Sequence, residues 1–151
     1  AELASLVSVA RSALRDVRTI AHREPAVSLA AELQRGTDLL SAVGIDTHIN
    51  QSCGALPQKV DELFAWAVRE GVTNVVRHSS ATTCSVAVTR RDGTLTLEIE
   101  NDGAGLPSSV GHGLRGLAAR AGALAGRARG QALMGGRFVL TVEVPDLASG
   151  T

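Results

Sequence analysis

The sequence predicts an α/β fold of the α+β kind: a two-layer sandwich in which a mixed sheet carries helices on one face. Segments with apolar residues at steps of three and four, typical of helices, alternate with segments in which every second residue is apolar, typical of strands. The chain has 151 residues, of which 44% are hydrophobic, so its length suits one domain with a buried core. That core must be aliphatic, because the chain has one tryptophan, two phenylalanines and no tyrosine.

Helices are expected at residues 2–23, 28–43, 58–78 and 113–124. The first carries an apolar stripe that suits either a dimer seam or packing against the rest of the domain, and it ends before Pro25. Ser28 suits the N-cap of the second helix, and Gly44 suits the position just past its end. The core-facing residues expected in the second and last helices are Leu29, Leu33, Leu40 and Val43, and Leu114, Leu117, Ala118, Ala121 and Leu124.

Strands are expected at residues 45–50, 85–89, 94–100, 128–134 and 137–144. The clearest hairpin joins the second of these to the third through the turn Arg91-Asp92-Gly93. In the third strand, Leu95, Leu97 and Ile99 alternate with polar residues and should face the core.

The composition excludes several classes of protein. Fifteen basic residues balance fifteen acidic ones, which argues against a large nonspecific nucleic-acid surface. Two cysteines without a CxxC spacing favour a reducing, cytosolic setting over a disulfide scaffold. No apolar run approaches the roughly 20 residues of a membrane helix. The chain begins with Ala1, so we expect it to be processed or cut from a longer protein.

The segment Arg69–His78 is the first of three clusters with chemical potential. Glu70, Asn74 and His78 follow one another at four-residue steps, so they line up on one strip of a helix. The strip is either a solvated edge or a site in which carboxylate and amide oxygens hold Mg²⁺ and position an attacking group.

The other two clusters are rich in glycine. Asn101–Gly105 directly follows a strand, and it is either a plain turn or a place where the backbone approaches a flat ligand beside the Asp102 carboxylate. Gly111–Gly116 opens a helix, whose free N–H groups suit phosphate. It is neither the strand-linked GxGxxG fingerprint nor a P-loop, since no lysine follows its glycines.

The order of the clusters is more informative than any one of them. The succession resembles the GHKL-type (Bergerat) ATP-binding domain of two-component sensor histidine kinases. "REGVTNVVRHS" (69–79) is similar to the asparagine box, and "NDGAG" (101–105) and "GHGLRGL" (111–117) are similar to the two glycine boxes. The "RHS" ending and the short spacing between the glycine boxes resemble the short-lid subfamily, whose response regulators bind DNA. "ARSALRDVRTIAHRE" (10–24) resembles the second helix of that subfamily's dimerisation and phosphotransfer hairpin.

The resemblance implies a Bergerat ATPase fold and a set of roles for individual residues. Glu70 would act as a base or polarising group beside the transferred phosphate. Asn74 would coordinate the Mg²⁺ that bridges the ATP phosphates. Asp102 would bind the adenine amino group. The remaining contacts to ATP would come from Arg77, His78, Gly103, Gly105, Gly111, Gly113, Leu114 and Thr141.

The resemblance also implies a division of the chain and a set of partners. Residues 1–24 would be the partial hairpin helix, and residues 25–151 the catalytic domain. The family's phosphoacceptor motif is missing, and we interpret His22 as a surface histidine. We therefore expect a cytoplasmic fragment of a membrane-anchored kinase. In the intact protein it would work as a homodimer and serve a response-regulator aspartate, with no direct nucleic-acid contact.

Two alternatives stay open on the sequence alone. The first is an anti-sigma-factor serine kinase of the same superfamily, which the chain length suits. The second is a dimerisation module that kept the fold and lost nucleotide binding, against which Glu70, Asn74 and Asp102 argue.

Overall fold

The computed structural model describes residues 27–78, 80–104 and 111–147. In chain order the elements are α2 (Leu29–Ala42), β1 (Asp46–Gln51), α3 (Gln58–His78), β2 (Thr83–Arg91), β3 (Thr94–Asn101), α4 (Gly111–Gly122), β4 (Arg127–Leu133) and β5 (Arg137–Pro145). The helix expected at 2–23 lies outside the described residues.

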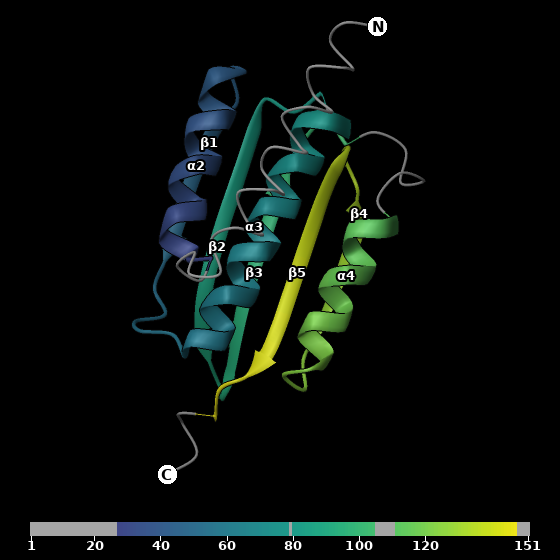
Figure 1. Ribbon diagram of the computed structural model, residues 1–151. Helices are drawn as coiled ribbons and strands as arrows, with labels where there is room; N and C mark the ends of the chain where they lie inside the picture. Colours follow the sequence, from purple (N-terminus) through teal and green to yellow (C-terminus); the bar gives the residue numbers. More distant parts are fainter. Residues whose placement is uncertain (1–26, 79, 105–110, 148–151) are drawn as a thin grey trace, which may run out of the picture.

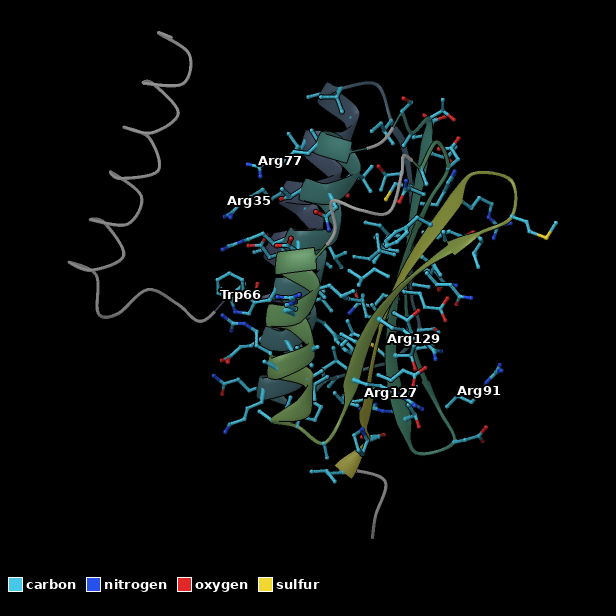
Figure 2. The ribbon with its side chains drawn as sticks, turned by 90° about the vertical axis from the view of Figure 1, so that its right-hand side faces the viewer. Arg35, Trp66, Arg77, Arg91, Arg127 and Arg129 are labelled. Atoms are coloured by element: carbon cyan, nitrogen blue, oxygen red, sulfur yellow. The ribbon has the colours of Figure 1, made fainter. Side chains whose placement is uncertain are left out.

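The five strands form one mixed sheet in the order β1-β2-β3-β5-β4. β1 runs parallel to β2, and the other neighbours are antiparallel. The three helices cover one face of this sheet (Figure 1), and the view in Figure 2 separates the helix layer from the sheet. The prediction of a two-layer sandwich with helices on one face is therefore confirmed.

The ends of α2 follow the expected capping chemistry. The Ser28 hydroxyl accepts a hydrogen bond from the Ala31 N–H at 3.0 Å, and Gly44 adopts a positive φ of 81° just past the helix. The inward orientation expected for Val43 is wrong, since its side chain is 52% exposed. Val43 is the C-cap, where the backbone leaves the helical path, and Ile45 takes the buried position after the turn.

The β2–β3 hairpin confirms the predicted turn. Asp92 and Gly93 have φ values of 53° and 75°, the two positive values of a type I′ turn. The pairing continues from Arg91 opposite Thr94 to Cys84 opposite Asn101, so β2 is longer than the alternation predicted.

The last helix packs along a narrower stripe than expected. Leu117 and Ala121 are buried, and Leu114 and Leu124 pack against the core. Ala118 was expected to face inward but is exposed. One residue along a helix turns the side chain by about 100°, so Ala118 leaves the line through Leu117 and Ala121.

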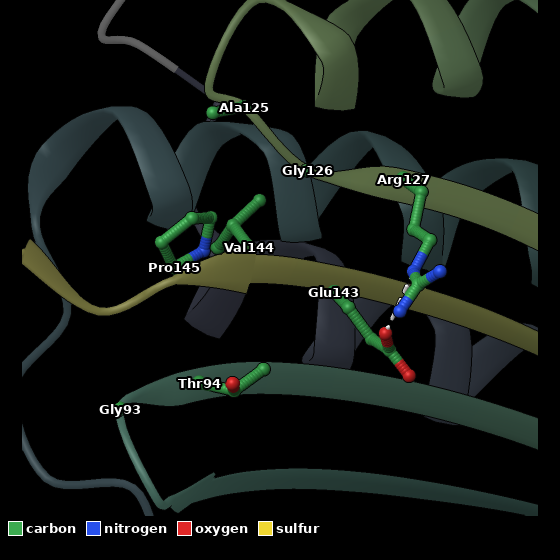
Figure 3. Close-up of a pocket in the computed structure, with 8 residues that line it drawn as sticks. All are labelled: Gly93, Thr94, Ala125, Gly126, Arg127, Glu143, Val144 and Pro145. Atoms are coloured by element: carbon green, nitrogen blue, oxygen red, sulfur yellow. Dashed lines mark hydrogen bonds and ion pairs between the residues drawn. The ribbon is translucent and has the colours of Figure 1, made fainter.

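The hairpin end of the sheet is held by Arg90. Its guanidinium donates to the carbonyl oxygens of Cys53 at 2.6 Å and Ala55 at 2.9 Å, and it pairs with the buried Asp146 carboxylate at 2.8 Å. A pocket of about 380 Å³ lies at the same end, beside the Glu143–Arg127 ion pair (Figure 3).

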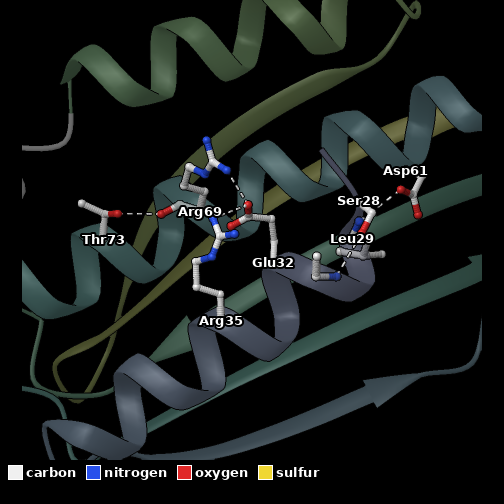
Figure 4. A network of polar contacts seen from close by, with 8 residues as sticks. Ser28, Leu29, Glu32, Arg35, Asp61, Arg69 and Thr73 are labelled. Atoms are coloured by element: carbon white, nitrogen blue, oxygen red, sulfur yellow. Dashed lines mark hydrogen bonds and ion pairs between the residues drawn. The ribbon is translucent and has the colours of Figure 1, made fainter. Parts of the chain in front are cut away.

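Polar contacts fix α3 between its neighbouring helices. The buried Glu32 carboxylate on α2 accepts hydrogen bonds from Arg69 at 2.5 Å and Arg35 at 3.3 Å (Figure 4). The guanidinium carbons of Arg69 and Arg120 lie 4.7 and 4.5 Å from the centre of the Trp66 ring, within cation–π range. Trp66 thereby links α3 to Arg120 on α4.

Candidate functional site

The strip predicted on α3 meets the first turn of α4. Glu70 and Asn74 are partly exposed on α3, one turn apart. A Cβ added at Gly113 would lie 2.7 Å from Cγ of Glu70, and closer still to its Cδ and Oε1. The Glu70 carboxylate therefore lies directly against the backbone of Gly113, and only glycine fits there without a shift.

A second contact orients α4 along α3. Arg120 stacks on Trp66, four residues before Glu70, while Gly113 lies at Glu70 itself. Since the later residue of α4 meets the earlier residue of α3, the two helices run antiparallel. The N-terminus of α4, with its unpaired N–H groups and positive dipole end, is thus held at the middle of the α3 strip.

The loop after β3 is organised by the Asp102 carboxylate. Its Oδ1 accepts hydrogen bonds from the backbone N–H groups of Thr82 at 2.8 Å and Thr83 at 2.9 Å. Its Oδ2 accepts from the Thr82 hydroxyl at 2.5 Å. The Thr82 hydroxyl first, then the two backbone donors, lower the pKa of Asp102 to about 2, so the side chain is a carboxylate at neutral pH.

Close backbone contacts hold the same loop in place. Gly103 has a positive φ of 60°, and a Cβ there would lie 2.5 Å from the Ser80 carbonyl carbon. The Ser80 N–H donates to the Gly103 oxygen at 2.9 Å, and the Ala104 N–H donates to the Gly136 oxygen at 2.8 Å. The loop is therefore tied to the end of α3 on one side and to the β4–β5 turn on the other.

Asn101 is a polar residue of this region that the sequence analysis did not single out. It is 6% exposed and continues the buried row of Leu95, Leu97 and Ile99, so it faces the helix layer. Gly71 of α3 packs over Ile99, and Ser80 beyond α3 bonds to Gly103, which places Asn101 between these two contacts. The strict alternation of β3, carried one residue further, was the signal for it.

Asp102 lines a pocket of about 300 Å³ at the end of the sheet. His48, Ser85, Glu100 and Arg137, which line it too, belong to the exposed rows of their strands, and Glu100 forms an ion pair with Arg137. The lining does not include Glu70 or Asn74. The pocket walls add Thr83, Cys84 and Asn101 to these residues.

The thiol of Cys84 is buried beside this loop. Burial first, and the negative charge of Asp102 second, raise the pKa of Cys84 to about 11. The group is thus a neutral thiol at physiological pH and not a nucleophile.

The remaining predicted residues are spread along the same region. Arg77 is exposed near the end of α3 (Figure 2), which His78 ends, and Gly111 and Leu114 belong to the first turns of α4. Gly105 lies outside the described residues. Thr141 stands between Glu98 and Arg129 in the row that alternates with the core residues of β5, so it faces away from the helices and is not brought to Asp102.

Two curated proteins are similar to the chain in sequence. It is 30% identical over 127 residues to sensor histidine kinase DesK of Bacillus subtilis (strain 168), which covers 79% of the chain and 34% of that protein. It is 27% identical over 123 residues to sensor histidine kinase YvfT of the same organism, covering 79% and 33%. The chain thus spans about a third of the length of these relatives. No protein-family model matches it.

Solved structures of histidine kinases share the fold. Acinetobacter baumannii AdeS superposes with a TM-score of 0.63 at 16% identity, over 97% of this chain and 83% of that one. A blue-light activated histidine kinase of Erythrobacter litoralis EL346 gives 0.62 at 18% identity, over 83% and 47%, and the catalytic domain of ThkA gives 0.57 at 12%, over 79% and 94%.

Relatives and fold together identify the chain as a GHKL-type histidine kinase ATPase domain. The resemblance drawn from the three motifs is thereby confirmed at this level. Among the described residues, no helix of this ATPase domain has the length and apolar character needed to cross a membrane.

Domains of this type use ATP, and the residues at the α3–α4 contact fit a triphosphate. Gly113 leaves the helix N-terminus free of a Cβ, and the N–H groups of a first helical turn suit phosphate. The described part of the ATPase domain holds no group of three or more His, Cys, Asp or Glu side chains that could bind a metal ion. A magnesium ion at Asn74 fits only as a partner of phosphate, which is how proteins usually hold it.

Proposed function

We propose that the chain is the ATP-binding catalytic domain of a sensor histidine kinase. In this role it binds Mg-ATP and donates the γ-phosphoryl group to a histidine that the given sequence does not contain. The observation that carries the proposal is the contact between Glu70 and the first turn of α4. It joins a carboxylate to a helix N-terminus, which is the combination that phosphoryl transfer uses for a base and a phosphate cradle.

Glu70 would receive or polarise the proton of the attacking imidazole at its carboxylate. Its neighbour Asn74, one turn later on α3, would offer an amide oxygen to the magnesium ion. When bound, that ion would neutralise charge on the phosphates, which is most of what phosphoryl transfer requires besides positioning.

The triphosphate would lie along the N-terminus of α4. Gly111, Gly113 and Leu114 would supply main-chain N–H groups, while Arg77 and His78 at the end of α3 would add donors. Gly105 is included in this proposal from its place in the motif alone.

The base would be recognised at the loop after β3. Asp102 would accept a hydrogen bond from the adenine amino group, and Gly103 would let the ring approach the backbone. Asn101, which faces the helix layer, is an additional polar group on the nucleotide side. Thr141 has the least support, because it lies in the outward row of β5.

The intact protein would work with partners that this chain does not include. We propose a homodimer that phosphorylates its own histidine and passes the phosphoryl group to an aspartate of a response regulator. Residues 1–24 would belong to the dimerisation hairpin and residues 25–151 to the catalytic domain. The domain would be cytoplasmic and joined to a membrane anchor outside this sequence, and the short-lid subfamily would explain the spacing of the glycine boxes.

Calorimetric titration of Mg-ATP into the chain tests the proposal, with Asp102→Asn as the paired variant. We expect saturable binding by the parent and a large loss in the folded variant. The same sample given labelled ATP should retain no label on His22, His48, His78 or His112. Absence of binding by the parent would refute an active ATP site in this chain.

The anti-sigma-factor kinase is not favoured, because both curated relatives are sensor histidine kinases. Specific capture of a purified sigma factor by the chain would reopen that alternative.

A further inference from the structure

The linker between α3 and β2 supplies all three hydrogen bonds that the described residues make to the Asp102 carboxylate. Thr82 provides two of them, through its N–H to Oδ1 at 2.8 Å and its hydroxyl to Oδ2 at 2.5 Å. Thr83 provides the third, through its N–H to Oδ1 at 2.9 Å. Thr82 is exposed, so this arrangement does not serve to bury a polar group.

The three bonds are distributed unevenly over the two carboxylate oxygens. A carboxylate has about four acceptor positions, two on each oxygen. Oδ1 uses both of its positions on backbone donors. Among the described residues, Oδ2 has only the Thr82 hydroxyl, so the acceptor position left for a ligand is on Oδ2.

We propose that Thr82 is a positioning residue for base recognition: its hydroxyl holds Oδ2 of Asp102 in the orientation that accepts the amino group of adenine. The proposal rests on the proposed function, since it takes Asp102 as the base-recognising carboxylate. Thr82 itself does not touch the nucleotide.

The hydroxyl matters separately from the backbone donors. The two N–H groups both approach Oδ1, so they leave the carboxylate free to rotate about its own axis and exchange the positions of its oxygens. A third donor on Oδ2 removes that freedom. It also keeps the group ionised, which a good acceptor requires, because a protonated oxygen would present a donor to the adenine amine.

Three variants separate this role from ordinary loop stability. Thr82→Val removes the hydroxyl at nearly constant shape, and Thr82→Ser keeps it. Thr89→Val is the matched control, because Thr89 is also an exposed threonine and lies at the far end of β2. Thermal unfolding of each variant verifies that the fold is kept.

The readout is the ratio of the dissociation constants for ATP and for inosine triphosphate, measured by calorimetry with Mg²⁺. Inosine carries a carbonyl where adenine carries the amino group, so it cannot donate to Oδ2. We expect Thr82→Val to bind ATP about five- to tenfold more weakly, as for loss of one hydrogen bond at a charged acceptor, with inosine triphosphate nearly unchanged. Thr82→Ser and Thr89→Val should keep the parent ratio.

Each other outcome overturns a defined part of the reasoning. If the parent fails to bind ATP, the proposed function falls and takes this inference with it. If the parent binds, Asp102→Asn loses binding and Thr82→Val matches the parent, the inference alone is wrong. If Thr82→Val weakens both nucleotides by the same factor, Thr82 shapes the loop without orienting Oδ2, and the positioning role is refuted.

Discussion

Replacement of Gly113 by alanine tests the contact on which the active-site arrangement depends. The new Cβ would lie 2.7 Å from Cγ of Glu70 and closer to the carboxyl atoms beyond it. Turning the carboxyl group alone brings no relief, because Cγ would still be too close. Glu70 must change its χ1 rotamer on α3, or α4 must move away from α3.

The magnitude follows from two opposing terms. Alanine is favoured over glycine in a helix by about 1 kcal/mol. Forcing an extra methyl group into a filled position costs about 1–3 kcal/mol. We therefore expect Gly113→Ala to lower the free energy of unfolding by about 0–2 kcal/mol, as the balance of strain and propensity.

Gly116→Ala is the control on the same helix. A Cβ there would meet no atom within 4 Å, so only the propensity term acts and we expect stabilisation by about 0.5–1 kcal/mol. Glu70→Ala removes the obstacle, and in that background Gly113→Ala should become as favourable as Gly116→Ala. Urea unfolding of the four variants and the double mutant measures the coupling between the two sites.

Activity should follow the displacement of Glu70. Gly113→Ala should weaken Mg-ATP binding and slow phosphoryl transfer to a supplied acceptor-histidine domain, whereas its secondary structure stays intact. Equal stability changes for the two glycine variants, or a Gly113 effect that persists without the Glu70 side chain, would refute the close contact described above.

Further predictions concern the loop after β3. Gly103→Ala should destabilise the fold by about 1–3 kcal/mol, since φ is positive there and the Cβ would meet the Ser80 backbone, and urea unfolding measures it. The lowered pKa of Asp102 stabilises the fold fully above its ordinary value, and this contribution should fade as the pH falls toward 2. The stability gap between the parent and Asp102→Asn should therefore narrow between pH 4 and pH 2, and a constant gap would contradict the assignment. Cys84, buried with a pKa of about 11, should react with an aromatic disulfide reagent at pH 7.5 only at the rate of unfolding.

Most of the architecture could be predicted from periodicity, because the alternation in the strands and the stripes of the helices are set by the same burial that shapes the core. The predictions failed where an element ends or narrows. Val43 follows the pattern of its helix but sits at the C-cap, where the chain turns outward. Ala118 follows an apolar stripe, yet alanine is small enough to be tolerated on either side of it.

The candidate site was predictable in its members but not in its connections. The four-residue spacing placed Glu70 and Asn74 on one strip, but only the packing of α4 on α3 shows that Gly113 meets Glu70. No local pattern pairs Thr82 with Asp102, which are twenty residues apart. Asn101 was missed because the Asn-Asp-Gly sequence is typical of a turn, while the pleat of β3 keeps this residue in the buried row.

The Arg90 cluster at the hairpin end has a consequence for how variation in this domain should sort. Arg90 joins Cys53, Ala55 and Asp146 at the end of the sheet opposite to the loop of Asp102 and Gly103. In a deep mutational scan, substitutions around Arg90 should reduce the amount of folded protein and leave the nucleotide affinity of the surviving molecules unchanged. Substitutions around Asp102 should do the reverse. The two ends of β2 and β3 would then accumulate separate kinds of suppressor, and stabilising changes found at the Arg90 end could rescue costly changes at the other.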